Sequence, residues 1–336
     1  MSIADLNINS TLSNRLNKLK RQSPEAYFYW AKTCQLYTNN NMQKELKLQY
    51  FERLIAENGS DKYFIEQFLQ GSGNELQKKF WSDRSSSRLC FDLYSWLCNE
   101  KEIKNFQFEK HLPGILVGEN KTAGTPNMDV FFEKCDNVVF IESKYTEKSG
   151  WKYKDDKHRD GFYLSEAYWG EKGYKSCRMS IGERFYDNPQ IAESFRGFCE
   201  DIQKEINQRK EKEQKHFSWF DPKQETCHLF GIIFYVINNK IKNKNIFLCN
   251  NVYEIKNSDC FKIEGSIVEV FKKKAELMLN KIFKENNCKF TFEVNTIQEM
   301  LENGFKGLDF PKAKMFAMRN ESLVNYIKTH YQESKR

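Results

Sequence analysis

The order of apolar and polar positions predicts a helical amino-terminal region. Residues 24–58 have helical periodicity, with Ser23 suited to cap the helix and Pro24 to occupy its first turn. An Asn-Gly-Ser sequence interrupts the pattern, and a shorter helix is predicted over residues 63–69. We therefore expect residues 1–75 to form a helical region, in which no cluster of chemically active side chains stands out.

The next part of the chain combines one helix with three segments that have the spacing of strands. A helix is predicted after the serines 85–87, because Leu89, Phe91, Leu93, Trp96 and Leu97 form a broad apolar stripe. Apolar residues alternate over residues 103–109, and two short apolar runs follow, TPNMDVFFE and NVVFIESKY. The polar turn Lys134-Cys135-Asp136-Asn137 separates these two runs, which favours a β-hairpin.

The remainder predicts further helices and strands. We expect helices over residues 188–215, 223–238, 267–283 and 323–331, and strands over residues 245–249 and 289–294, the first of which residues 252–255 would extend. Residues 146–186 have no such periodicity. The predicted organisation is a helical region (1–75), a core (76–300) with a loop insertion (146–186), and a carboxy-terminal helical tail (301–336).

A hairpin closed symmetrically about its polar turn brings charged side chains together. Asp129 would face Glu142, and like charges directly opposite one another across two strands are unfavourable. Lys144 would share the face of Glu142, because residues two apart on a strand point the same way. The consecutive apolar residues 139–141 predict that this second strand is buried on both faces.

A divalent cation between the two carboxylates would relieve their repulsion. Mg²⁺ is bound in proteins by one or two carboxylates, with water and phosphate oxygens completing its shell, and Mn²⁺ can substitute for it. Asp129 and Glu142 match this description, and the backbone carbonyl of Ser143 could add a neutral oxygen. Lys144 could then orient an attacking water or neutralise a phosphate in phosphodiester hydrolysis.

These residues resemble the motif of the PD-(D/E)xK nuclease superfamily. The resemblance lies in Pro126-Asn127-Met128-Asp129 followed by Glu142-Ser143-Lys144 on the next strand, although two residues separate the proline from the aspartate. The predicted elements between residues 84 and 256 are similar to the αβββαβ core of that superfamily. The serine-rich helix start and the strand ending at Glu109 are similar to a group of type II-like bacterial restriction endonucleases.

The resemblance implies a fold and a site. The fold would be α/β (α+β), with a restriction-endonuclease-like αβββαβ core, a mixed central sheet flanked by helices, and an added amino-terminal helical region. Asp129, Glu142 and Lys144 would form the catalytic triad of a Mg²⁺-dependent nuclease. Glu109 could be a third acidic ligand, since the superfamily often has one upstream, or an exposed strand end beside Lys110.

Two further segments each have two interpretations. Gln224 and His228 lie one helical turn apart, where some related nucleases carry a Gln-x-x-x-Tyr pair that supports the site. Since the second position is histidine here, we favour a core histidine bonded to a backbone carbonyl. The aromatic and basic residues of 146–186 could contact DNA or could pack inward as a folded insertion, because acidic residues nearly balance the basic ones.

Composition narrows the class of protein. The net charge of +7 over 336 residues permits an anionic partner without requiring one. The ten cysteines form no C-x-x-C pair, and several lie within apolar runs, so we expect reduced thiols rather than disulfides or a zinc cluster. The longest apolar run, residues 229–237, is too short to span a bilayer, so we expect a cytoplasmic protein that does not associate with membranes.

The leading hypothesis is a Mg²⁺-dependent endonuclease that cuts DNA in restriction or defence. A homodimer would suit cleavage of both strands of a duplex, and a partner methyltransferase is compatible with this role. A structure-specific repair or recombination nuclease, or an RNase, could be built on the same core, because the triad acts on phosphate rather than on sugar or base. A nucleic-acid-binding protein without catalytic activity is the third alternative.

Overall fold

The computed structural model describes residues 10–37, 41–56, 63–70, 76, 80, 85–114, 126–144, 185–208, 220–252 and 266–296. Almost all of the expected 146–186 insertion, and the whole 301–336 tail with its predicted helix, lie outside these residues. The chain forms two compact units, one with residues up to Lys110 and Asp129–Glu133, and a second that holds the other described residues. The division at residues 75 and 300 stays a prediction.

The first unit is built from helices, most of one strand and residues 129–133 of a second strand. Its elements are α1 (Ser10–Gln22), α2 (Pro24–Tyr37), α3 (Asn41–Ala56), α4 (Tyr63–Gln70), α5 (Ser86–Tyr94), the 3₁₀ helix η4 (Ser95–Asn99) and β1 (Ile103–His111). The helix expected over residues 24–58 is formed as two, α2 and α3. Ser23 caps α2 as predicted, because its Oγ accepts a hydrogen bond from the backbone N–H of Ala26 at 3.2 Å.

Phenylalanine rings from α4, α5 and β1 form the core of this unit. Phe68 and Phe108 are stacked with ring centroids 5.0 Å apart, and Phe64 meets Phe108 edge-on at 5.2 Å. The ring of Phe91 lies 5.9 Å from that of Phe108, and all four residues are buried. Aromatic pairs at such separations add to the free energy of area burial, so this cluster anchors β1 to the helices.

The second unit contains three parallel strands, the first of which is also the second strand of the hairpin. Its elements are β2 (Asn127–Lys134), β3 (Asn137–Lys144), α7 (Pro189–Gln208), α8 (Pro222–Asn238), β4 (Asn245–Val252), α9 (Ile267–Ile282), the 3₁₀ helix η9 (Phe283–Asn286) and β5 (Lys289–Thr296), with residues 129–133 of β2 counted in the first unit. β3 pairs in parallel with β4, and β4 with β5. The predicted helix and strand types are confirmed for these elements.

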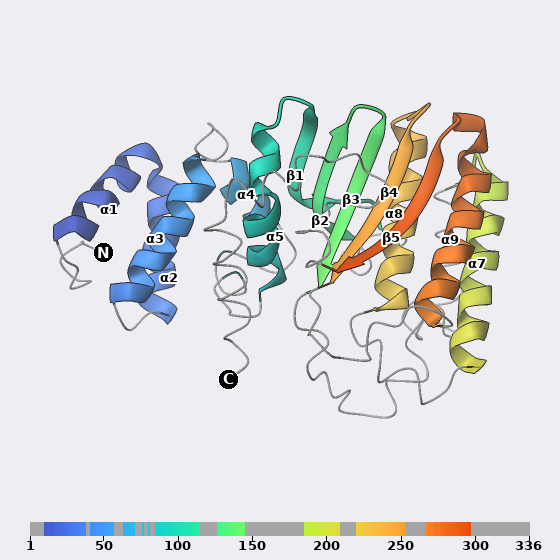
Figure 1. Ribbon diagram of the computed structural model, residues 1–336, viewed down its shortest axis with the longest axis horizontal. Coiled ribbons are helices and arrows are strands. Elements are labelled where there is room, and N and C mark those ends of the chain that lie inside the picture. Colours follow the sequence, from blue (N-terminus) through green and yellow to red (C-terminus); the bar gives the residue numbers. More distant parts are fainter. Residues whose placement is uncertain are drawn as a thin grey trace. The chain divides into compact units, whose positions relative to one another are not determined.

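The strands form one five-stranded sheet in the order β1-β2-β3-β4-β5 (Figure 1). A turn of two residues, Cys135 and Asp136, connects the neighbours β2 and β3, so these strands are antiparallel, because a parallel pair needs a long crossover. The protein is therefore mixed α/β, with a mixed sheet flanked by helices, as expected. β3 is buried along almost its whole length, which confirms the prediction from its consecutive apolar residues.

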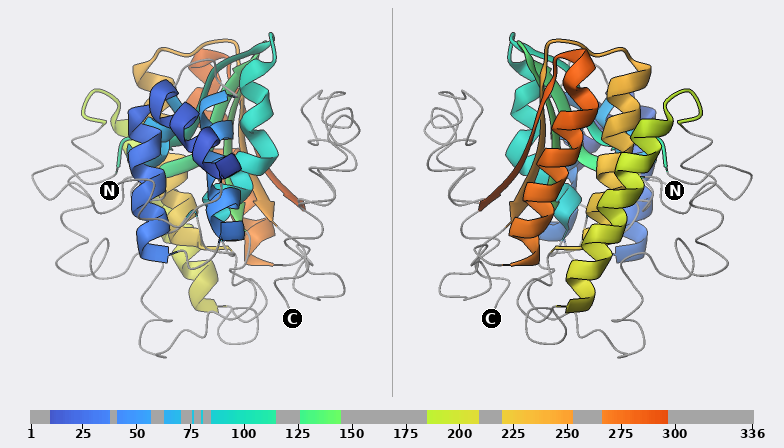
Figure 2. Two further views of the ribbon diagram at one scale, coloured as in Figure 1. Left: turned by 90° about the vertical axis from the view of Figure 1, so that its left-hand side faces the viewer. Right: turned by 90° about the vertical axis from the view of Figure 1, so that its right-hand side faces the viewer.

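Helices α8 and α9 cover one face of the parallel strands. The ring centroids of Phe140 on β3 and Tyr235 on α8 are 5.6 Å apart, and those of Phe292 on β5 and Phe271 on α9 are 5.7 Å apart. Phe140 and Phe292 lie in one row across the sheet, since both are in register with Leu248. Helix α7 packs beside α9 on the same side (Figure 2). Strand alternation places Glu142 and Lys144 on this helix-covered face.

The described cysteines agree with one expectation from composition. Cys90 and Cys249 are buried, as expected for small core residues. Among the helices that the structure describes, none has the length and apolar character needed to cross a membrane.

Gly231 allows α8 to approach the segments at the ends of β1 and β2. A Cβ atom at this position would lie 2.7 Å from Cβ of Leu112 and 2.9 Å from Cγ of Pro126. The backbone N–H of Leu112 donates to the carbonyl of Pro126 at 2.9 Å, so the two contacted residues hold one another in place. The close approach of α8 therefore depends on glycine at residue 231.

Replacing Gly231 with alanine is expected to destabilise the protein by about 1–3 kcal/mol, because overpacking outweighs the better helix propensity of alanine. Gly197 on α7 is the matched control, since no atom lies within 4 Å of a Cβ built there. Gly197→Ala should leave stability unchanged or raise it by up to about 1 kcal/mol. Urea denaturation of both variants measures the difference, and equal effects would contradict the packing argument.

Candidate functional site

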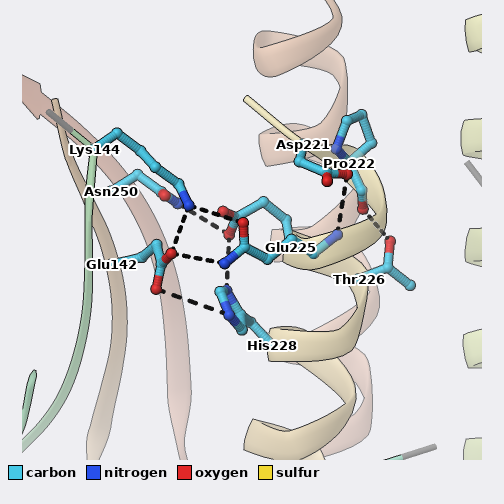
Figure 3. Close-up of polar contacts among 9 residues, drawn as sticks. Glu142, Lys144, Asp221, Pro222, Glu225, Thr226, His228 and Asn250 are labelled. Carbon is cyan, nitrogen blue, oxygen red and sulfur yellow. Dashed lines mark hydrogen bonds and ion pairs between the residues drawn. The ribbon is translucent and has the colours of Figure 1, made fainter. Parts of the chain in front are cut away.

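The end of β3 presents a carboxylate and an ammonium on one face of the sheet. Nζ of Lys144 donates to Oε1 of Glu142 at 2.6 Å, and both side chains are buried. This contact confirms the predicted common face. Both side chains point from the strand toward α8 (Figure 3). Burying two charges is costly unless they are paired and hydrogen-bonded, so the pair needs further partners.

Gln224 in the first turn of α8 supplies those partners. Its Nε2 donates to Oε1 of Glu142 at 2.7 Å, and its Oε1 accepts from Nζ of Lys144 at 2.8 Å. The amide thus places its donor on the carboxylate and its acceptor on the ammonium. Asp221 caps the helix here, since its Oδ1 accepts from the backbone N–H of Gln224 at 3.2 Å. Glu142, Lys144 and Gln224 form a closed ring of three hydrogen bonds, called here the Glu–Lys–Gln ring.

His228 lies one turn further along α8, between two carboxylates. Its Nε2 is 3.9 Å from Oε2 of Glu142, and its Nδ1 is 3.5 Å from Oε2 of Glu225. The imidazole is buried, and within the described residues we find no hydrogen bond from it to a backbone carbonyl. The favoured sequence interpretation is therefore confirmed for the core position of His228 and wrong about its partner, because carboxylates rather than a backbone carbonyl lie on either side.

The surroundings of His228 shift its pKa. Burial lowers the pKa, because it disfavours the charged imidazolium. The carboxylates of Glu142 and Glu225 act in the opposite direction and outweigh burial, and Lys144 opposes them only weakly. The net result is a pKa raised above the usual value of 6.5. Protonation of His228 is therefore favoured by the carboxylates that flank it.

Asn250 and Glu225 also belong to this group of buried polar side chains, and neither was predicted from the sequence. Nδ2 of Asn250 on β4 donates to Oε2 of Glu225 at 3.1 Å, and both side chains are buried. Asn250 is the register partner of Glu142, so it lies beside the ring on the neighbouring strand. The available signal was the Asn250-Asn251 pair in an otherwise apolar strand, where asparagine is disfavoured.

The other predicted site residues have separate positions. Asp129 is half-buried on β2, and its pairing with Glu142 stays a prediction. Glu109 on β1 belongs to the first unit and has a left-handed backbone with φ of 49°, which is uncommon for glutamate. Oγ of Ser87 donates to Oε1 of Glu109 at 3.4 Å. The side chain of Ser143 is buried on the face opposite Glu142, in register with Asn251.

Glu142 offers a carboxylate, which is the kind of ligand that a hard cation prefers. Within the described ranges, no group of three or more His, Cys, Asp or Glu side chains is arranged to hold a metal ion. Mg²⁺ does not need such a group, because it binds through one or two carboxylates and keeps several waters. Glu142 supplies one carboxylate, with Oε1 held by the ring and Oε2 facing His228 at 3.9 Å. A Mg²⁺ site at Glu142 therefore stays a prediction.

Comparisons with family models, with curated proteins and with solved structures found no match to this chain. Its function is therefore inferred from its own residues.

The raised pKa of His228 predicts a specific pH dependence of stability. A histidine whose folded pKa is raised stabilises the folded state below its unfolded pKa of about 6.5, and this contribution is lost as pH rises through the folded pKa. The difference in unfolding free energy between wild type and His228→Gln should therefore be largest in acid and shrink as pH rises above 6.5.

Chemical denaturation across this pH range measures the difference. Repeating the comparison in a Glu142→Gln background is the control, because Glu142 makes the largest contribution that raises the pKa. The pH dependence should be smaller in that background. A difference that grows with increasing pH would show that burial, rather than the carboxylates, dominates at His228.

Proposed function

We propose that the protein is a Mg²⁺-dependent endonuclease that hydrolyses DNA phosphodiester bonds, of the restriction or defence type. The observation that carries this proposal is the Glu–Lys–Gln ring, in which Glu142 and Lys144 of the motif are held together at the end of a buried strand. An isolated charged strand end in solvent would have no such arrangement. Burial of paired titratable groups beside a buried histidine is typical of functional sites.

The order of elements supports a PD-(D/E)xK core. Helix α5, strands β1, β2 and β3, helix α8 and strand β4 follow one another in the order αβββαβ, with α7 inserted and α9 and β5 added afterwards. The middle strand of the sheet, β3, carries Glu142 and Lys144, and its neighbour β2 carries Asp129. This placement matches the motif in which the acidic residues lie on adjacent strands of a hairpin.

Each residue would have a distinct role. Glu142 and Asp129, with the carbonyl oxygen of Ser143 and with Glu109, would hold Mg²⁺, which supplies charge neutralisation and a bound water of lowered pKa. Lys144 would orient the attacking water and neutralise charge on the phosphate. Gln224 fixes the directions of Glu142 and Lys144, and His228 stands behind Glu142 in a supporting position.

DNA is the proposed substrate, and the net charge of +7 is compatible with it. A homodimer would carry two such sites, one for each strand of a duplex. A partner methyltransferase would protect the host's own DNA if the enzyme acts in restriction. None of these partners is needed for the test of the chemistry itself, which uses the purified chain alone.

Purified protein is expected to cut plasmid DNA with Mg²⁺ and not with a chelator. Lys144→Ala and Asp129→Ala should each lower the cleavage rate by about a hundredfold or more, because each removes a group that stabilises the transition state. Lys273→Ala is the matched control, since this lysine is exposed on α9 and, within the part of the chain that the structure describes, pairs with Glu269. Its rate should equal that of the wild type.

Parallel reactions on duplex DNA, single-stranded DNA and RNA identify the polymer. Cleavage of RNA alone would replace the DNA proposal with an RNase. The enzyme proposal would be contradicted if none of the three polymers is cleaved with Mg²⁺ or Mn²⁺ and if Lys144→Ala and Asp129→Ala leave DNA affinity unchanged.

Asp129→Asn tests the pairing of Asp129 with Glu142. If the two carboxylates face one another, the substitution should raise stability without metal by about 0.5 kcal/mol, because it removes a like-charge repulsion. It should also abolish any stabilisation by added Mg²⁺. Asp136→Asn, at an exposed position in the turn of the same hairpin, should retain that metal response.

Thermal unfolding with and without Mg²⁺ measures both effects. Loss of stability in Asp129→Asn without metal would show that Asp129 has a different neighbour on the sheet.

A further inference from the structure

A buried carboxylate and a buried amide form a second polar pair next to the Glu–Lys–Gln ring. Nδ2 of Asn250 donates to Oε2 of Glu225 at 3.1 Å, and the two side chains are 1% exposed each. The pair connects the first turn of α8 to β4. Its atoms are separate from those of the ring, which connects the same turn of α8 to β3.

The orientation of the Asn250 amide is set by its partner. Reversing the amide would place Oδ1 against the carboxylate of Glu225, which offers only acceptors when ionised. In the present orientation Oδ1 is buried and, among the described residues, has no hydrogen-bond partner. Leaving a buried acceptor unsatisfied costs free energy. The contact with Glu225 therefore outweighs the loss at Oδ1.

Neighbouring residues of α8 engage neighbouring strands. Gln224 binds Glu142 and Lys144 on β3, whereas Glu225 binds Asn250 on β4. Asn250 and Glu142 are direct register partners across these two strands. The first turn of α8 is thus attached to two neighbouring strands at residues that are in register. Rotation of the helix, or its movement along the strands, would break one of the two attachments.

Stability alone does not account for this second pair. A buried polar pair adds little net stability compared with apolar side chains of similar volume, because both partners must give up water. Such a pair does impose direction, since it is satisfied in only one geometry. The direction imposed here is that of the helix turn that carries Gln224.

We propose that Glu225 and Asn250 are a positioning pair, which holds α8 at the height from which Gln224 bridges Glu142 and Lys144. The consequence for catalysis rests on the nuclease function proposed above. Without the pair, the amide of Gln224 no longer reaches both charges, and Lys144 loses its hydrogen bond to Gln224 while keeping the one to Glu142. Its ammonium then becomes more accessible and less well directed toward a phosphate.

A reciprocal exchange tests the pair. Asn250→Asp places a carboxylate against that of Glu225, which breaks the contact. Adding Glu225→Gln restores an amide opposite a carboxylate with the direction of the hydrogen bond reversed. The matched control is Asn251→Asp, which makes the same change at the next residue of β4, where the buried side chain faces the other side of the sheet and accepts from Asn295.

The first readout is the rate at which an amine-reactive reagent labels Lys144, measured by mass spectrometry on the folded protein. Lys144 is 8% exposed and held by two acceptors, so labelling of the wild type should be slow. Asn250→Asp should raise the rate about tenfold, since a hydrogen bond to a charged group is lost. The second readout is the cleavage rate, for which kcat should fall about tenfold with KM unchanged.

The double variant should return both readouts toward wild type, and Asn251→Asp should leave both unchanged although it destabilises the strand. Labelling of Lys144 at the wild-type rate in Asn250→Asp would overturn the proposal, as would an equal increase in Asn251→Asp or failure of the double variant to recover. If Asn250→Asp does not fold, Asn250→Ala and Glu225→Ala replace it with the same expected increase.

The labelling rate tests this inference, and the cleavage rate of the wild type tests the proposed function. If the wild-type protein cuts no nucleic acid, the nuclease proposal fails while the labelling rates still decide whether the pair positions Gln224. If the protein cuts DNA but the labelling rates do not differ, the positioning role fails and the nuclease proposal stands.

Discussion

The burial of the Lys144 ammonium is the constraint on which the rest of the site depends. Removing an ammonium from water costs several kcal/mol unless hydrogen bonds replace its hydration. Glu142 provides one acceptor on the same strand, and Gln224 provides a second from α8. The helix must therefore begin where it does, at Pro222, with its first turn against the end of β3. Phe140 and Tyr235, farther along the same strand and helix, continue this contact as apolar packing.

The sequence predicted those parts of the structure that depend on local pattern. Alternation along β3 placed Glu142 and Lys144 on one face, and the polar residues 134–137 predicted the turn that separates β2 from β3. These features follow from the two-residue repeat of a strand and from turn chemistry, which act over a few residues. The sequence also predicted that β3 is buried on both faces, because an uninterrupted apolar run has no polar face to turn toward water.

Contacts between distant segments could not be predicted in the same way. The pairing of Glu142 with Asn250 depends on the parallel register of β3 and β4, which a long crossover connects. Nothing local to either strand sets that register, and a shift by one residue would place Asn251 on the helix side instead. Of the two carboxylates around His228, Glu142 was missed for the same reason, because it belongs to a distant strand. Glu225 lies three residues before His228 on α8, so helical spacing alone puts the two side chains close together.

The closed form of the Glu–Lys–Gln ring has a consequence that an open chain of contacts lacks. Each member takes part in two of the three hydrogen bonds, so removal of any one side chain breaks two of them and leaves a single contact. Substitution of one member therefore never removes a single hydrogen bond of the ring, because it removes two of the three. Gln224 has the only neutral side chain in the ring, and its amide meets opposite charges at its two ends. A glutamate there would attract Lys144 but repel Glu142, and a lysine would do the reverse, whereas the amide offers a donor to one and an acceptor to the other.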